Sequence, residues 1–283
     1  MIKVLVPYDF SEQALNALNF TTELAEKIEG VHIEVVNVLE VPYVSSIGTM
    51  GGGEIMPEME NQVFFIQLME KRKEQVADLK EKYKDKKFKF NVKLKLGNAF
   101  KSITESILEE NPDVVVMGSK GSSGIEEVLI GSNTEKIVRT ATCPVITVKS
   151  ATDPSKFKKI VFASNFKEDE DEIARRMKNL QYLFDADLYF VVVNTPANFE
   201  TTRDSIKRIG MFVKKYGFEG VKAEIYNSLS EESGIIEFAE DIDADLIAMA
   251  THGRTGFLHL ITGSIAEDVV NHAKRPVWTL KVI

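Results

Sequence analysis

Two glycine-rich turns in this chain share one spacing pattern, and turns of this kind can bind phosphate. They are Gly118-x2-Gly121-x9-Gly131-Ser132 and, 132 positions later (250 minus 118), Ala250-x2-Gly253-x9-Gly263-Ser264. Each turn follows an apolar run and ends in Gly-Ser at the start of a helical pattern. Backbone N–H groups in such turns and at helix N-termini bind anions. The pattern predicts a tandem duplication with two phosphate-binding turns.

The serine that ends each turn has a second interpretation. Ser132 and Ser264 precede Glu135 and Glu267 by three positions, which is the pattern of a capping box. A cap uses one backbone N–H and leaves the others free, so a serine can cap its helix while the turn binds phosphate. The sequence leaves both roles open.

Motifs for phosphoryl transfer and for metal binding are absent from the sequence. No Gly-Lys-Ser/Thr occurs, and no Gly-x-Gly-x-x-Gly follows the first strand, so the usual phosphate-binding lysine of nucleoside triphosphatases is missing. The four histidines do not have the spacing of a metal site. We expect no catalytic residues, no metal ligands and no enzymatic activity.

The elements that position these turns alternate between short β-branched runs and longer amphipathic stretches. Strands are expected at 3–7, 32–38, 88–96, 114–117, 145–148, 159–163, 188–194, 221–226, 246–250 and 277–282. Helices are expected at 11–28, 58–83, 99–109, 133–140, 170–184, 201–216, 231–241 and 265–272. This alternation is typical of βαβ units in a parallel sheet. We predict an α/β protein with two tandem doubly wound domains, each a five-stranded parallel sheet with helices on both faces.

The domain boundary is expected in a short polar segment that contains Pro154. We place the first domain at 1–152 and the second at 153–283. The offset between the copies is 156 at the first strand (160 minus 4) but 132 at the glycine turn, so the first copy holds 24 extra residues (156 minus 132). They lie between its second and third strands and include a glycine-rich insertion at 45–57. This insertion is either a disordered tip or a lid over the first glycine turn.

Composition excludes several classes of protein. The net charge of −8 argues against a nucleic-acid-binding protein, and no apolar run is long enough to span a membrane. The N-terminus has no secretory signal pattern. The single cysteine, Cys143, cannot form an intrachain disulfide and is expected to be a buried apolar residue. We expect a cytoplasmic protein.

The glycine motif, the segment 6–11 (Val-Pro-Tyr-Asp-Phe-Ser) and Cys143-Pro144-Val145 together resemble the universal stress protein (UspA-like) family. The resemblance covers essentially the whole chain, as two domains in tandem. It implies an adenine nucleotide alpha hydrolase-like fold, binding of ATP or ADP, with Mg²⁺ as a further option, and a role in stress-response signalling. It also implies dimerisation through the last strand of each domain. Slow ATP hydrolysis has no catalytic group to support it.

The resemblance also implies which residues bind the nucleotide. Asp9 would accept a hydrogen bond from the adenine side, although it could instead be the N-cap of the following helix. Val38 would contact the base through its backbone. The full set in the first domain is Pro7, Asp9, Val38, Gly118, Lys120, Gly121, Gly131, Ser132 and Asn133.

The second copy departs from this pattern at two positions. Asn165 replaces the carboxylate of Asp9, and Ala250 replaces Gly118, which adds a methyl group and penalises a positive φ. We therefore expect nucleotide mainly in the first domain. The weaker second set is Asn165, Thr195, Ala250, His252, Gly253, Arg254, Gly263, Ser264 and Ile265.

The last strands of the two halves, 145–149 and 277–281, are both apolar. Pairing between them would cover two edges that otherwise favour aggregation. We predict an intrachain pseudo-dimer about a pseudo-twofold axis, with a homodimer of the whole chain and an unidentified protein partner as further options. The alternative function is an interaction scaffold that binds no nucleotide, or a protein that binds another small ligand.

Overall fold

The structure is a computed structural model that describes residues 1–40, 56–119, 130–167, 171–252 and 265–282. The first copy contains β1 (Ile2–Pro7), α1 (Glu12–Lys27), β2 (Val31–Leu39), α2 (Met56–Lys82), β3 (Lys89–Leu96), α3 (Ala99–Glu110), β4 (Val114–Gly118), α4 (Ser132–Thr140) and β5 (Val145–Val148). A short 3₁₀ turn, η1 (Pro154–Lys156), follows. The second copy contains β6 (Lys159–Ala163), α5 (Asp171–Phe184), β7 (Asp187–Asn194), α6 (Thr202–Tyr216), β8 (Lys222–Asn227), α7 (Glu231–Asp241), β9 (Leu246–His252), α8 (Ile265–His272) and β10 (Val277–Val282).

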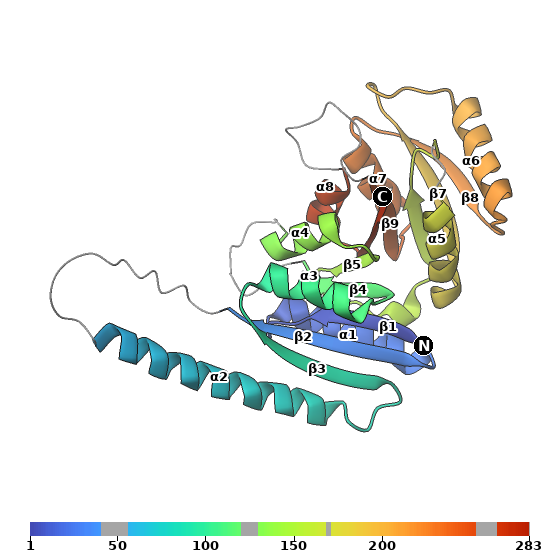
Figure 1. The fold of residues 1–283 in the computed structure, drawn as a ribbon. Coiled ribbons are helices and arrows are strands. Elements are labelled where there is room, and N and C mark those ends of the chain that lie inside the picture. Colours follow the sequence, from blue (N-terminus) through green and yellow to red (C-terminus); the bar gives the residue numbers. More distant parts are fainter. Residues whose placement is uncertain (41–55, 120–129, 168–170, 253–264, 283) are drawn as a thin grey trace, which may run out of the picture.

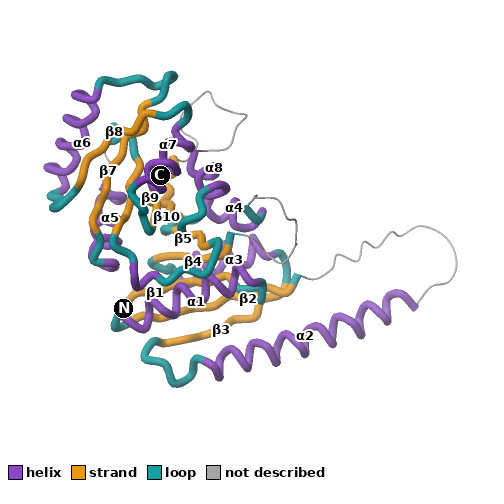
Figure 2. Tube along the Cα trace, turned by 180° about the vertical axis from the view of Figure 1, so that it is seen from behind, coloured by secondary structure: helices purple, strands orange, loops and turns teal. Residues whose placement is uncertain are grey.

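The ten strands form one continuous sheet in the order β3-β2-β1-β4-β5-β10-β9-β6-β7-β8. Within each copy the neighbouring strands are parallel, and only β5 and β10 run antiparallel. The α/β class and the two five-stranded parallel units are therefore confirmed. Figures 1 and 2 show the two copies side by side, and Figure 2 labels β10 next to β5, where the copies join. The boundary between residues 152 and 153 stays a prediction.

The register between β5 and β10 is that of a twofold contact. Ile146 faces Trp278, its own counterpart in the repeat (278 minus 132), while Val277 faces Thr147 and Thr279 faces Val145. The Thr147 hydroxyl donates to the Val277 carbonyl (3.3 Å), and the Thr279 hydroxyl donates to the Val145 carbonyl (3.4 Å). The predicted pairing of the last strands about a pseudo-twofold axis is confirmed.

Helices cover both faces of the sheet because alternate strand residues point to opposite sides. In β1, Val4 and Val6 pack in one core cluster with α1 and α2, and this cluster continues through the second copy. Leu5 packs in a separate cluster with α3 and α4. Cys143 lies in that second cluster, 6% exposed, and burial raises the pKa of its thiol to about 11, as expected of a buried apolar residue.

Helix α2 accounts for half of the extra length in the first copy. It has 27 residues where α6 has 15, a difference of 12 residues. Both views show α2 extending past the end of β3 (Figures 1 and 2). Val76 and Leu79 near its C-terminal end are buried in the core, whereas Phe64 is 61% exposed. The glycine-rich part of the insertion, 45–55, lies outside the described residues.

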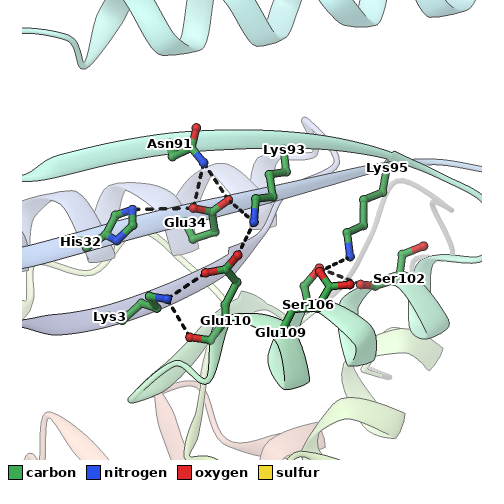
Figure 3. A network of polar contacts seen from close by, with 10 residues as sticks. All are labelled: Lys3, His32, Glu34, Asn91, Lys93, Lys95, Ser102, Ser106, Glu109 and Glu110. Carbon is green, nitrogen blue, oxygen red and sulfur yellow. Dashed lines mark hydrogen bonds and ion pairs between the residues drawn. The ribbon is translucent and has the colours of Figure 1, made fainter.

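A network of charged side chains lines the sheet face beside α3 (Figure 3). Glu34 is 2% exposed and accepts hydrogen bonds from Asn91 at 3.0 Å, and the Lys93 ammonium lies 3.5 Å away. Glu110 accepts hydrogen bonds from Lys3 (2.8 Å) and from Lys93, which lower its pKa to about 2. Carboxylates and ammonium groups pair with one another here, so the network joins β1, β2, β3 and α3.

Among the described helices, none is long and apolar enough to cross a membrane.

Candidate functional site

A tight turn follows β1 and fixes the position of Asp9. The Asp9 carboxylate accepts a hydrogen bond from the backbone N–H of Ser11 at 3.0 Å, and Phe10 between them has a φ of 69°. The N-cap of α1 is Ser11, whose hydroxyl oxygen accepts from the Ala14 N–H (3.2 Å). The alternative that Asp9 is the N-cap is therefore wrong. Asp9 instead organises the turn at the end of the strand.

The second copy repeats this turn without the carboxylate. The Asn165 side-chain oxygen accepts from the Lys167 N–H at 2.9 Å, and Phe166 has a φ of 52°. A non-glycine residue with positive φ is uncommon, so its occurrence at both sites marks a feature of the duplicated fold. Because the amide oxygen of Asn165 accepts the same hydrogen bond, the replacement keeps the turn and removes only the negative charge.

Gly118 is required by the packing of α1. A Cβ atom at this position would lie 2.6 Å from the backbone carbon of Gln13 and 2.9 Å from the Ala14 nitrogen, which is too close for any side chain. Its φ lies outside the left-handed region, so the argument that Ala250 is penalised by a positive φ does not hold.

Among the residues that the structure describes, no side chain caps the N-terminus of α4. Its N-cap is Gly131, with φ −63° and ψ 140°, and Ser132 is already the first residue of the helix. The predicted capping box at Ser132 is therefore wrong, and Glu135 bonds to Gly131 only through its backbone N–H (3.0 Å). The first backbone N–H groups of a helix have no partner within it. They face the loop side of the sheet beside exposed Ser132 and half-buried Asn133. The equivalent Ser264 lies outside the described residues.

The first set of site residues lies along one edge of the sheet. Strand β1 is flanked by β2 and β4, so Pro7, Val38 and Gly118 lie near the carboxyl ends of three adjacent parallel strands. The Thr134 hydroxyl donates to the Gly118 carbonyl at 2.9 Å and fixes α4 against β4. Ligands of open α/β sheets bind at this edge. Lys120 and Gly121 lie outside the described residues.

Part of the second set lines a cavity of about 410 Å³. Asn165, Ala250 and Ile265 line it, and Val193 occupies the register position that Val38 has in the first copy. Thr195 is not among the lining residues; it is 3% exposed, and its hydroxyl donates to Glu231 (3.3 Å). His252 is the last residue of β9, and Gly253, Arg254, Gly263 and Ser264 lie outside the described residues.

Two arginines that no motif revealed lie against the turns. In the second copy Arg208 donates to the Asn165 carbonyl (2.6 Å) and to Glu200 (2.5 Å). Hydrogen bonds from Arg208 and Lys167 lower the pKa of Glu200 to about 2. Arg208 lies in α6 and Glu200 in the loop before it, where the sequence shows only an ordinary charged helix, while Lys167 follows β6. These charges pair at one side of the cavity.

In the first copy Arg72 of α2 lies over the Phe10 ring, with 4.8 Å between the guanidinium carbon and the ring centroid. Its Nε and Nη1 atoms are buried and have no hydrogen-bond partner in the described part of the chain. The Asn37 side-chain oxygen is likewise buried without a partner, while its amide nitrogen donates to the Tyr8 carbonyl (2.5 Å). Arg208 beside the second turn is thus paired with a carboxylate, whereas Arg72 beside the first turn lies over an aromatic ring. No group of three or more metal-ligating side chains occurs within the described ranges.

Comparisons with known proteins agree with the duplication. The model of the universal stress protein family matches the chain twice, at residues 1–149 and 156–281. Universal stress protein MJ0577 of Methanocaldococcus jannaschii is 30% identical over 153 residues, which cover 52% of this chain and 94% of that protein. The Slr1230 universal stress protein of Synechocystis is 26% identical over 176 residues, covering 60% of this chain and 58% of that protein.

Two solved structures share the fold over nearly the whole chain. A universal stress protein from Archaeoglobus fulgidus DSM 4304 has a TM-score of 0.74 and 21% identity, with 99% of this chain and 98% of that chain covered. A putative universal stress protein from Pseudomonas aeruginosa UCBPP-PA14 has a TM-score of 0.66 and 16% identity, with coverages of 99% and 92%. The chain therefore belongs to the universal stress protein family, as a member with two copies of the domain in tandem.

Proposed function

We propose that the protein is an ATP- or ADP-binding regulatory protein of the stress response, with the nucleotide mainly in the first domain. In this proposal the nucleotide is a signal and is not turned over rapidly. Membership of the family supports the role, and the residues at the edge of β2, β1 and β4 support the site. We also propose a cytoplasmic location and a downstream protein partner, both by analogy with the family.

The observation that carries the proposal is the start of α4. Gly131 precedes the helix and no side chain in the described ranges caps it, so the first N–H groups of α4 would be available to phosphate oxygens. The partial positive charge of a helix N-terminus favours an anion there. A phosphate bound at this point would require no displacement of a capping side chain.

The base would bind at the other end of the same edge. Asp9 keeps a carboxylate at the end of β1, and the polypeptide backbone of Val38 is at the end of the neighbouring β2. A carboxylate accepts hydrogen bonds from an exocyclic amino group, which adenine has. Mg²⁺ would enter with the phosphates, as their counter-ion. A turnover above roughly 1 per second would contradict the proposal of a binding protein.

A second candidate function is the binding of another small ligand in the second domain. The cavity of about 410 Å³ favours it, because this volume falls in the usual range of small-molecule sites. Much of its wall is apolar, with Val191, Val193, Ile235 and Met249 among the lining residues. In this alternative the protein is a scaffold that responds to a ligand other than nucleotide.

Titration of the purified protein with ATP and with ADP, followed by calorimetry, tests the two candidates. We expect one strong site in the wild type. Gly131→Val should abolish it, because a branched side chain would occupy the entrance of α4, while the matched variant Gly263→Val should leave it intact. Circular dichroism verifies that both variants are folded. Absence of ATP and ADP binding by the folded wild type would refute the first candidate and leave the second.

A further inference from the structure

The second domain contacts the end of the first glycine turn. The Ile130 backbone N–H donates to the side-chain oxygen of Asn271 in α8 at 2.8 Å. The Ile130 side chain packs against the second-domain core cluster that contains Val269 and Val270. The next residue, Gly131, is the N-cap of α4. A residue of the second domain thus holds the backbone immediately before the helix N-terminus of the first site.

Asn271 is itself held in place. Its backbone carbonyl accepts a hydrogen bond from the ammonium group of Lys149, which follows β5 of the first domain. One turn earlier in α8, Glu267 accepts two hydrogen bonds from Arg139 of α4, at 2.8 and 2.7 Å. Glu267 is 7% exposed, whereas the Arg139 side chain is 52% exposed, so the bidentate pair has a buried carboxylate and a guanidinium that still reaches solvent. The contact of Lys149 fixes α8 relative to the end of β5, and the contact of Arg139 fixes α8 relative to α4.

The contact reaches α4 through the backbone. The Gly131 N–H donates to the Ser119 carbonyl at 2.6 Å, and the Gly131 carbonyl accepts from Glu135 at 3.0 Å. Ile130, Gly131 and the first turn of α4 therefore form one hydrogen-bonded unit. Loss of the bond to Asn271 would leave the Ile130 N–H without its acceptor, and this part of the backbone would sample other conformations.

The contact is not reciprocal between the copies. The pseudo-twofold axis relates position 271 to position 139 (271 minus 132), which is Arg139. Arginine has only donors, whereas asparagine also has an acceptor oxygen. Arg139 therefore cannot accept a hydrogen bond from a backbone N–H of the second turn. The side chain at position 271 of the second domain can therefore accept a hydrogen bond from the first glycine turn, whereas the side chain at the matching position 139 of the first domain cannot accept one from the second glycine turn.

We infer that Asn271 is a positioning residue for the ligand site of the first domain, so that this site is complete only with the second domain docked. The inference rests on the proposed function for the identity of the ligand. It goes further in assigning a role to the second domain, whose own site is the weaker nucleotide candidate. By linkage, a ligand bound at the start of α4 and the docking of α8 stabilise each other.

Two readouts in the full-length protein test this inference. The first is ATP affinity by calorimetry, and the second is amide hydrogen exchange at Ile130, measured by NMR without ligand. Asn271→Leu removes the acceptor at nearly constant size and should weaken ATP binding about tenfold, the equivalent of one hydrogen bond of ~1.4 kcal/mol. It should also speed the exchange at Ile130. Asn271→Asp keeps an acceptor and should leave Ile130 slow, with affinity within about threefold of the wild type.

Arg139→Gln is the matched control, because it breaks the pair with Glu267 without removing the acceptor for Ile130. We expect it to lower stability but to leave Ile130 exchange slow. ATP binding of wild-type strength in folded Asn271→Leu, or unchanged exchange at Ile130, would overturn the inference. If the wild type binds no ATP but exchange at Ile130 quickens in Asn271→Leu, the proposed function fails while the positioning contact stands.

Discussion

In the first copy the turn after β1 carries the carboxylate of Asp9, and in the second copy the same turn carries the neutral amide of Asn165. Both side chains accept the same local hydrogen bond, and both are followed by a phenylalanine with positive φ. The comparison separates two properties of Asp9, its hydrogen-bond acceptor in the turn and its negative charge. An oxygen acceptor is enough for this hydrogen bond, so the turn itself does not require the negative charge of Asp9.

The surroundings of the two turns differ as well. Beside the second turn, Arg208 is bound by Glu200 and by the Asn165 carbonyl, whereas Arg72 beside the first turn lies over Phe10. The α4 and α8 helices also contribute unequally, since Asn271 of α8 binds the first turn and Arg139 of α4 binds Glu267. Duplication thus preserved the backbone, and divergence changed the charges and contacts around each site.

The largest expected effect concerns the glycine that only the first copy keeps. Gly118→Ala should lower the free energy of unfolding by about 3 kcal/mol, because the new methyl would overlap the backbone of α1 at Gln13. The reverse change in the second copy, Ala250→Gly, should cost less than about 1 kcal/mol. Urea unfolding of both variants gives the comparison. A stable Gly118→Ala protein that loses only ligand binding would show that the glycine serves the ligand instead.

Breaking the ion pair between Arg139 and Glu267 at the domain interface should cause the next largest loss of stability. Arg139→Ala leaves Glu267 nearly buried without its bidentate partner and should lower stability by about 2 kcal/mol. Asn271→Ala, at the matching position of the other helix, should cost about 1 kcal/mol, because it removes one neutral hydrogen bond. Thermal unfolding of the two single variants measures both. Equal losses would argue against an unequal interface.

Exchanging the turn residues between copies addresses ligand binding directly. Asp9→Asn should keep stability within about 0.5 kcal/mol, since the amide oxygen replaces the carboxylate in the turn. It should weaken ATP binding about tenfold, through loss of a charge-assisted hydrogen bond to the base. Asn165→Asp provides the matched change in the second copy. Unchanged ATP affinity in Asp9→Asn would show that the carboxylate has no role in binding.

The smallest expected effect is a pH dependence at a lysine position where only the first copy has a carboxylate. Lys3 donates to the backbone carbonyl of residue 110, and Lys159 does the same at residue 242, but only the first copy has a carboxylate there, Glu110. The Lys3 and Lys93 hydrogen bonds lower the pKa of Glu110 from 4.5 to about 2. Its contribution is therefore full above pH 4.5 and is lost as the pH falls towards 2.

Glu110→Gln should accordingly lower stability by about 1 kcal/mol at pH 7, with partial screening by solvent taken into account. The difference from the wild type should shrink as the pH falls below about 4.5, where the wild-type carboxylate becomes protonated in the unfolded state. Urea unfolding at several pH values measures this difference. Ile242→Leu is a control that touches the matching position without a charge. A difference that stays constant down to pH 3 would contradict the prediction.

The sequence predicted the order and type of every α-helix and strand that the structure describes, because apolar β-branched runs alternate with longer helical stretches, but it did not predict the 3₁₀ turn η1. It also predicted the pairing of β5 with β10 from two apolar last strands. Its errors concern which atoms meet at helix ends. The capping-box spacing predicts Ser132 as the N-cap. In the structure the N-cap is Gly131, so the helix begins one residue earlier than predicted. No local pattern distinguishes these two registers.

The contacts of Gly118, Arg72 and Asn271 could not be predicted either, since each joins segments far apart in the sequence. Gly118 contacts α1 more than 100 positions earlier, and Asn271 contacts Ile130 at a separation of 141 residues. Arg72 belongs to a helix whose charges resemble those of any exposed helix. Such contacts depend on the angles at which helices cross the sheet, which the hydrophobic pattern does not specify.

The sequence by itself determined the duplication, the α/β units and the edge of the sheet where a ligand would bind, because hydrophobic periodicity and glycine spacing are local properties. Only the tertiary structure decided that Gly118 serves helix packing, that Gly131 and not Ser132 is the N-cap of α4, and that Asn271 reaches across the domain interface. The physical reason is that burial and hydrogen bonding depend on which surfaces meet. Two copies with nearly the same pattern can therefore differ in the charges and contacts that surround each site.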